Sequence, residues 1–162
     1  MPYGEKPGIK EVIEFNTFTE SYKLHNLDIP DFAKKFNSSV LIDNTIISLP
    51  YGDEHSSDSN LGLLFDVVTG EYKVFDIGIP FGGKYRFRSG INYRGKAMFL
   101  PSGTPSCPIL LIDTEGNVVA KEYSNKFLIG RPIKHENIIK TMAYSFEDKQ
   151  SYVMALDSFL GN

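Results

Sequence analysis

Apolar and polar residues alternate over short runs along this chain, and no window longer than about ten residues carries a 3.6-residue period. Runs rich in β-branched and aromatic residues predict strands; they cover residues 38–50, 61–68, 72–79, 96–100, 108–113, 117–123 and 151–157. Polar clusters such as Asp43-Asn44 and Tyr93-Arg94-Gly95 separate them and favour hairpin turns. The one helical pattern is a short connector at 29–36, so we expect helix in less than about a tenth of the chain.

The order of strands and turns repeats along the chain. Residues 13–30 align without a gap on residues 63–80, which matches Asn16 with Asp66, Thr19 with Thr69 and Tyr22 with Tyr72. A third copy at 109–123 places Asp113 where Asp66 stood, and a fourth at 152–162 places Asp157 there. The repeat unit is therefore about 44 to 50 residues long, a period that indicates a repeat architecture.

Four short antiparallel strands per unit are typical of a β-propeller blade. The segment LLFDVVTGEYKVFDI resembles the strand, Asp, turn, Gly, strand centre of kelch-like repeats, which implies a propeller. We therefore predict an all-β fold of consecutive four-stranded antiparallel meanders, arranged as a partial or small β-propeller. Residues 1–162 form one array, with a half copy at 2–30, complete copies at 36–80 and 84–123, and a partial copy at 127–162.

Three and a half copies fall short of the roughly four to eight blades of closed propellers. The two ends could combine into one closing blade, a second chain could complete a larger ring, or the array could stay open. An open array leaves strand edges and apolar faces unpaired, which favours association. We expect a protein partner, either another copy or a neighbouring subunit, to supply the missing strands by edge pairing.

The charge and the cysteine content limit the classes of partner and the cellular compartments that fit the sequence. Seventeen basic and twenty acidic residues give a net charge of −3, which argues against nucleic acid as a partner. The single cysteine, Cys107, cannot form an intrachain disulfide, which fits a reducing compartment but equally a disulfide-free secreted protein. No run approaches the ~20 apolar residues of a membrane span, and the first ten residues lack the apolar core of a signal peptide. We expect a cytoplasmic protein.

One segment concentrates positive charge. Residues 84–96 hold five basic residues and no acidic one, and alternation along a strand would place Lys84, Arg86 and Arg88 on one face. Such a row can bind a carboxylate or a phosphate, although solvated or internally paired arginines explain it as well. The predicted binding residues are Arg86, Arg88, Tyr93, Arg94 and Lys96, together with Tyr51 and Asp53 on a neighbouring loop.

Motifs for catalysis or metal binding are absent from the sequence. It has no G-x-S-x-G elbow, no G-x-G-x-x-G before a helix, and no CxxC or HExxH pattern, and the acidic loop at 51–60 lacks the EF-hand spacing. We therefore predict no metal, no cofactor and no catalytic residues. The sequence favours a non-enzymatic protein–protein interaction module or scaffold subunit; the alternative is a carbohydrate-binding or carbohydrate-active propeller domain, by analogy of fold.

Overall fold

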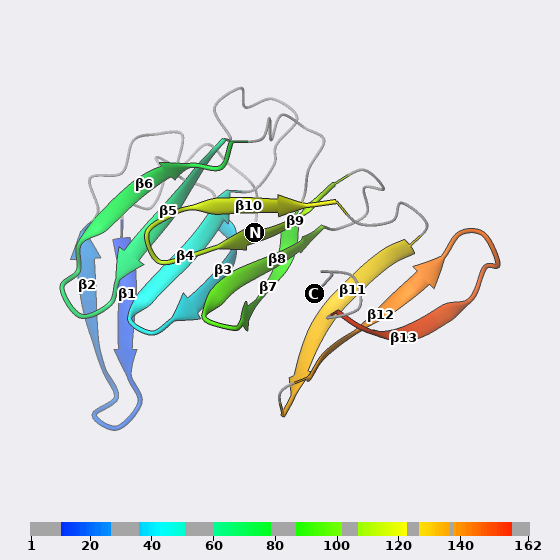
Figure 1. Cartoon of the computed structure of the whole chain (residues 1–162). Coiled ribbons are helices and arrows are strands. Elements are labelled where there is room, and N and C mark those ends of the chain that lie inside the picture. The colour runs from blue at the N-terminus through cyan, green and yellow to red at the C-terminus, as the bar shows by residue number, and fades with distance from the viewer. Residues whose placement is uncertain are drawn as a thin grey trace, which may run out of the picture.

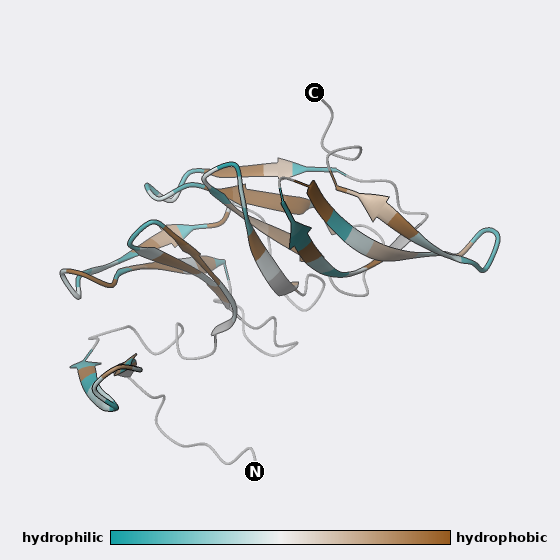
Figure 2. Cartoon of the chain, turned by 90° about the horizontal axis from the view of Figure 1, so that it is seen from below, coloured by the Kyte–Doolittle hydropathy of each residue, from teal (hydrophilic) through white to brown (hydrophobic). Residues whose placement is uncertain are grey.

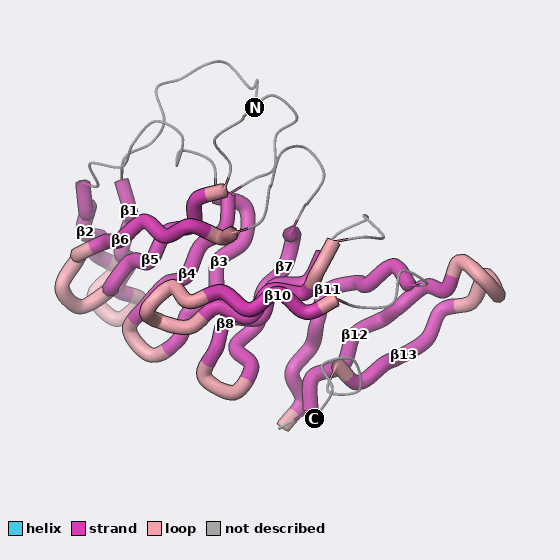
Figure 3. Tube along the Cα trace, turned by 45° about the horizontal axis from the view of Figure 1, so that its top comes forward, coloured by secondary structure: helices cyan, strands magenta, loops and turns pink. Residues whose placement is uncertain are grey.

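A computed structural model of the chain describes residues 11–26, 36–50, 60–78, 87–101, 107–122, 127–136 and 138–156. Within these ranges the regular elements are all β-strands (Figure 3). The all-β prediction is therefore confirmed for the described residues. The described residues contain no helix that is long and apolar enough to cross a membrane.

The strands form four antiparallel sheets in which strands adjacent in the chain pair with each other. Sheet I contains β1 (Glu11–Asn16) and β2 (Ser21–Asn26). Sheet II contains β3 (Phe36–Ile42), β4 (Thr45–Pro50), β5 (Leu61–Asp66) and β6 (Tyr72–Asp76). Sheet III contains β7 (Phe87–Tyr93), β8 (Lys96–Pro101), β9 (Ile109–Ile112) and β10 (Val118–Lys121). Sheet IV contains β11 (Phe127–His135), β12 (Ile138–Ser145) and β13 (Ser151–Ala155).

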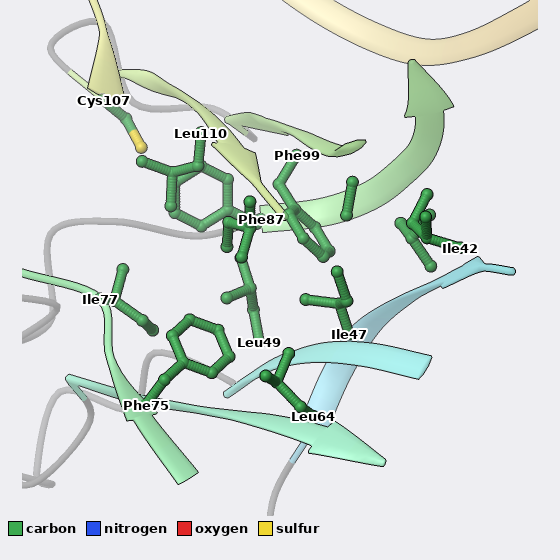
Figure 4. Close-up of a cluster of buried hydrophobic side chains, with 13 residues drawn as sticks. Ile42, Ile47, Leu49, Leu64, Phe75, Ile77, Phe87, Phe99, Cys107 and Leu110 are labelled. Carbon is green, nitrogen blue, oxygen red and sulfur yellow. The ribbon is translucent and has the colours of Figure 1, made fainter. Parts of the chain in front are cut away.

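The sheets follow one another in chain order across the molecule (Figure 1). Sheets II and III enclose the largest apolar cluster, which includes Leu49, Phe75, Phe99 and Cys107 (Figure 4). A second cluster joins sheets III and IV through Leu100, Ile109 and Ile139, among others. The first strands of neighbouring sheets touch, because β7 contacts both β3 and β11. Each inner sheet is thus covered on both faces. Successive residues of a strand point to opposite faces, and four in a row are buried both in β5 of sheet II and in β8 of sheet III.

Strands β1, β2, β7, β11 and β12 were not among the runs that the alternation predicted. In β11, Gly130 and Pro132 interrupt the pattern, and proline removes a ladder donor. Pro132 is tolerated because β11 lies at an edge of sheet IV and its register shifts between Ile129 and Pro132. The Thr141 hydroxyl donates a hydrogen bond of 3.0 Å to the Gly130 carbonyl at this irregularity. Residues 29–35 of the predicted connector lie outside the described residues, and Phe36 begins β3.

The aspartate of the repeat closes the loop between the last two strands of its sheet. Asp66 Oδ1 accepts hydrogen bonds of 2.8 Å from the backbone N–H groups of Val68 and Thr69. Asn16 Oδ1 accepts the equivalent two bonds in sheet I, and Asp113 Oδ1 accepts the N–H groups of Glu115 and Asn117 in sheet III. In sheet IV the corresponding position follows the third strand, β13, at Asp157, which lies outside the described residues. Ser145 ends the second strand, β12, where its hydroxyl accepts the N–H of Asp148 at 3.5 Å.

A left-handed backbone position recurs near the end of this loop in sheets I, II and III. It is occupied by Glu20 (φ 53°), Gly70 (φ 76°) and Gly116 (φ 89°). Glycine adopts this conformation without a Cβ clash, whereas other residues are strained in it. The glycine of the Asp-x-x-x-Gly pattern therefore has a backbone role.

Acid should weaken the loop that Asp66 closes. The N–H groups of Thr69 and Val68 hold the pKa of Asp66 below its usual 3.8, because they bind the charged carboxylate. A lowered folded-state pKa contributes stability that is present above the unfolded pKa and is lost as the pH falls through the folded pKa. We expect the free energy of unfolding, measured by urea titration from pH 6 to pH 2, to fall less steeply in Asp66→Asn than in the wild type. Parallel curves for the two proteins would contradict this expectation.

Candidate binding pocket

A pocket of about 330 Å³ opens between sheets III and IV, at the end where their first hairpins turn. This volume lies at the small end of the range of about 300 to 1,000 Å³ typical of ligand pockets. Two strands of sheet IV and the first hairpin of sheet III form its walls. The described residues that line it are Asn92, Tyr93, Arg94, Lys134 and Ile139.

The hairpin between β7 and β8 positions three of these side chains. Arg94 and Gly95 both have positive φ values, 51° and 76°, which suits a tight turn between twisted antiparallel strands. The Gly95 N–H donates to Asn92 Oδ1 at 3.3 Å. The turn therefore presents Asn92, Tyr93 and Arg94 together at the end of sheet III.

The electrostatics of the pocket favour an anion. The Arg94 guanidinium lies over the Tyr93 ring, 5.1 Å from its centroid, in a cation–π contact. Tyr93 is itself packed against the apolar cluster between sheets III and IV, which anchors this contact. Lys134 adds a second cation, and none of the described lining residues is a carboxylate. A guanidinium beside an ammonium can bind a carboxylate or phosphate through charge-assisted hydrogen bonds.

Two of the residues predicted from the sequence, Tyr93 and Arg94, line this pocket. Lys96 pairs with Tyr93 across the hairpin but is not among the described lining residues. Arg88 lies in β7, where its side chain is outside the described part of the structure. Arg86, Tyr51 and Asp53 also lie outside the described residues, so their role stays a prediction.

The charge of Lys96 acts on the repeat loop of its own sheet. Burial raises the pKa of Asp113, but hydrogen bonds from Asn117 and Glu115, together with the charge of Lys96, lower it by more. Asp113 Oδ1 accepts the Asn117 N–H at 2.8 Å, and the Asn117 side-chain amide donates to Asp113 Oδ2 at 3.0 Å. Lys96 thus supports a turn of sheet III.

Asn92, Lys134 and Ile139 were not predicted. Asn92 and Lys134 hold the same place in their sheets, one residue before the end of the first strand. The registers of Tyr93 with Lys96 and of His135 with Ile138 show this equivalence. Aligning the fourth copy on its first hairpin would have placed Asn92 and Lys134 at the same rim. In the sequence, only the alignment of the repeats indicates that Asn92 and Lys134 are equivalent.

The cysteine and one of the histidines pack within or between sheets. Cys107 is completely buried in the cluster between sheets II and III. His25 lies 2.8 Å from Glu14 and packs edge-on against Phe65, which joins sheets I and II. Across the described ranges, no group of three or more His, Cys, Asp or Glu residues is placed to hold a metal ion.

Comparison with known proteins identifies the fold alone. No family model matches the chain, and no curated protein matches it. The crystal structure of the extracellular domain of the putative one component system BT4673 from B. thetaiotaomicron is similar, with a TM-score of 0.52 at 12% identity over 88% of this chain. A structure described as the extracellular domain of the putative hybrid two component system BT4673 gives a TM-score of 0.51 at 12% identity over 88% of this chain. The chain spans 19% of the length of each.

Proposed function

We propose that this chain is a non-enzymatic protein-interaction module and that the pocket between sheets III and IV binds an anionic group of the partner. The observation that carries the proposal is the placement of Arg94 and Lys134 around one pocket, with the guanidinium held on the Tyr93 ring. Arginine and tyrosine are enriched among residues that dominate protein interfaces. The group that binds there would be a surface carboxylate or phosphate of the partner.

We further propose that the sheets are propeller-like blades of the kelch-like type. Four consecutive antiparallel sheets in chain order, with contacts between the first strands of sheets II, III and IV, support this arrangement. Blades of this kind present loops and turns on a common rim, where propellers bind their ligands. In this arrangement the pocket would belong to such a rim, because it lies beside the first hairpins of two neighbouring sheets.

Charge reversal in the pocket tests the proposed function. We expect Arg94→Glu combined with Lys134→Glu to weaken binding of a glutamate-rich peptide by about tenfold or more and to flatten its salt dependence. Both side chains are exposed, so the melting temperature should change little. Isothermal titration at several salt concentrations measures the effect, and Lys121→Glu on β10 is the control for a general loss of positive charge.

The carbohydrate alternative predicts a different result. A glycan array that shows sugar binding, combined with no peptide binding and no protein captured from native extract, would reject the interaction module. Equal peptide affinity for the double variant and the wild type would reject the pocket as the binding site.

A further inference from the structure

Sheet IV has one apolar face that no described residue covers. The eight residues of β12 alternate strictly, with Ile139, Thr141, Ala143 and Ser145 buried and the residues between them exposed. The buried set faces sheet III, because Ile139 belongs to the cluster shared with that sheet. The opposite set forms what we term the outer face of sheet IV; its apolar members are Ile133, Ile138, Met142, Tyr144 and Val153, and the exposed Lys140 lies among them, paired with Ile133.

The hairpin register shows that the same positions are covered in the two preceding sheets. Leu49, Leu100 and Met142 are each the fifth residue of the second strand of their sheet. Leu49 and Leu100 are only 0% and 1% exposed, because the next sheet packs on them. Met142 is 63% exposed.

The third strand repeats this contrast. Val153 pairs with Met142 on the outer face and corresponds to Ile109 of sheet III. Ile109 is completely buried against sheet IV, whereas Val153 is 72% exposed. At these two positions the outer face of sheet IV therefore keeps apolar residues where the preceding sheets bind their successor, whereas Lys140 stands where they have the buried Ile47 and Met98.

Sheet I presents the complementary face at the other end of the array. Ile13, Phe15 and Leu24 are exposed there and stand next to each other in the register of β1 and β2. Their counterparts in the repeat alignment are Leu63, Phe65 and Val74, which cluster on the face of sheet II that packs against sheet I. The outer face of sheet I thus has the residues with which an inner sheet meets its predecessor.

The two outer faces lie at opposite ends of the molecule, sheet I at the left and sheet IV at the right (Figures 1 and 2). One copy therefore does not bring them together. Each face groups several exposed apolar side chains next to one another. Contiguous exposed apolar patches of this kind mark interaction sites. A sheet of another copy can continue the stacking order in which III follows II and IV follows III.

We propose that the outer face of sheet IV binds the outer face of sheet I of a second copy of this chain, head to tail. The proposal deepens the interaction function by naming a partner, but it uses neither Arg94 nor Lys134, so the pocket can fail without affecting it. Because the two faces differ, the contact is heterologous and repeats from copy to copy, closing into a ring or extending as a filament. The wild-type chain should therefore self-associate, either as a ring of two or more copies or as a filament.

Variants with one blocked face test this arrangement. We expect Met142→Lys with Val153→Lys, and separately Phe15→Lys, to weaken self-association by at least about tenfold, because an added ammonium group would be buried in a largely apolar contact that already holds Lys140. Val68→Lys is the matched control, since Val68 is 67% exposed in the turn after β5 and lies on neither face. Sedimentation velocity over a range of concentrations gives the sizes of the species, and circular dichroism verifies that each variant is folded.

Mixing the two variants gives the decisive result. Each variant keeps one intact face, so the mixture should form a one-to-one dimer and stop there, while each variant alone stays monomeric. A wild-type chain that is monomeric at all concentrations would overturn the proposal. Self-association that the face variants leave unchanged would also overturn it. Unaltered peptide binding by the folded face variants would show that the pocket function stands apart.

Discussion

Phe99→Ala is expected to lower the free energy of unfolding by about 3 to 5 kcal/mol, the range for removing a fully buried aromatic ring. Phe99 is 0% exposed on β8 and lies in the cluster between sheets II and III, where its ring points towards Ile47 (Figure 4). Removal of the ring would leave a cavity that two rigid sheets cannot close. Urea or thermal unfolding followed by circular dichroism measures the loss.

A matched truncation separates burial from a general loss of apolar surface. Leu41→Ala removes an apolar side chain from β3, but Leu41 is exposed to solvent. We expect this variant to lose less than about 1 kcal/mol, because surface substitutions have small effects. Equal losses for Phe99→Ala and Leu41→Ala would contradict the packing of sheets II and III described above.

Gly90→Ala is expected to destabilise the same interface by about 1 to 3 kcal/mol, through overpacking instead of a cavity. A Cβ atom at Gly90 would lie 2.3 Å from Val40 Cγ2 and 2.9 Å from the Phe99 ring. Val40 belongs to β3 and Gly90 to β7, so the missing side chain lets the first strands of sheets II and III approach closely. Unfolding by urea measures the change in free energy.

A double variant identifies the cause of that loss. Val40→Ala removes the methyl group that the new Cβ would meet, so Gly90→Ala should cost less in the Val40→Ala background than in the wild type. Gly78→Ala is the control, because nothing lies within 4 Å of a Cβ there and its φ of +71° leaves only the backbone strain. Strictly additive effects of Gly90→Ala and Val40→Ala would show that the steric contact is not the cause.

Alternation and turn chemistry predicted many of the local elements. The runs at 61–68 and 72–79 contain β5 and β6, and the cluster Tyr93-Arg94-Gly95 forms the turn between β7 and β8. Prediction failed for β11, where Gly130 and Pro132 break the pattern. An edge position and a register shift accommodate them, and both are properties of the assembled sheet.

The candidate site was predictable only in part. Tyr93 and Arg94 share a hairpin, so the basic segment at 84–96 pointed to them. Lys134 comes from a different repeat, 40 residues after Arg94, and reaches the pocket because sheets III and IV stack with their first hairpins at the same end. A basic run in the sequence does not contain that information.

The sequence by itself determined many of the strands and turns, because these depend on interactions within a few residues. The hydrogen bonds from Asp66 to Val68 and Thr69 are of this kind. Only the tertiary structure decided which face of each sheet is covered. Leu100 and Met142 occupy the same repeat position, and the first is buried while the second is exposed, since sheet IV packs on one and no described residue packs on the other.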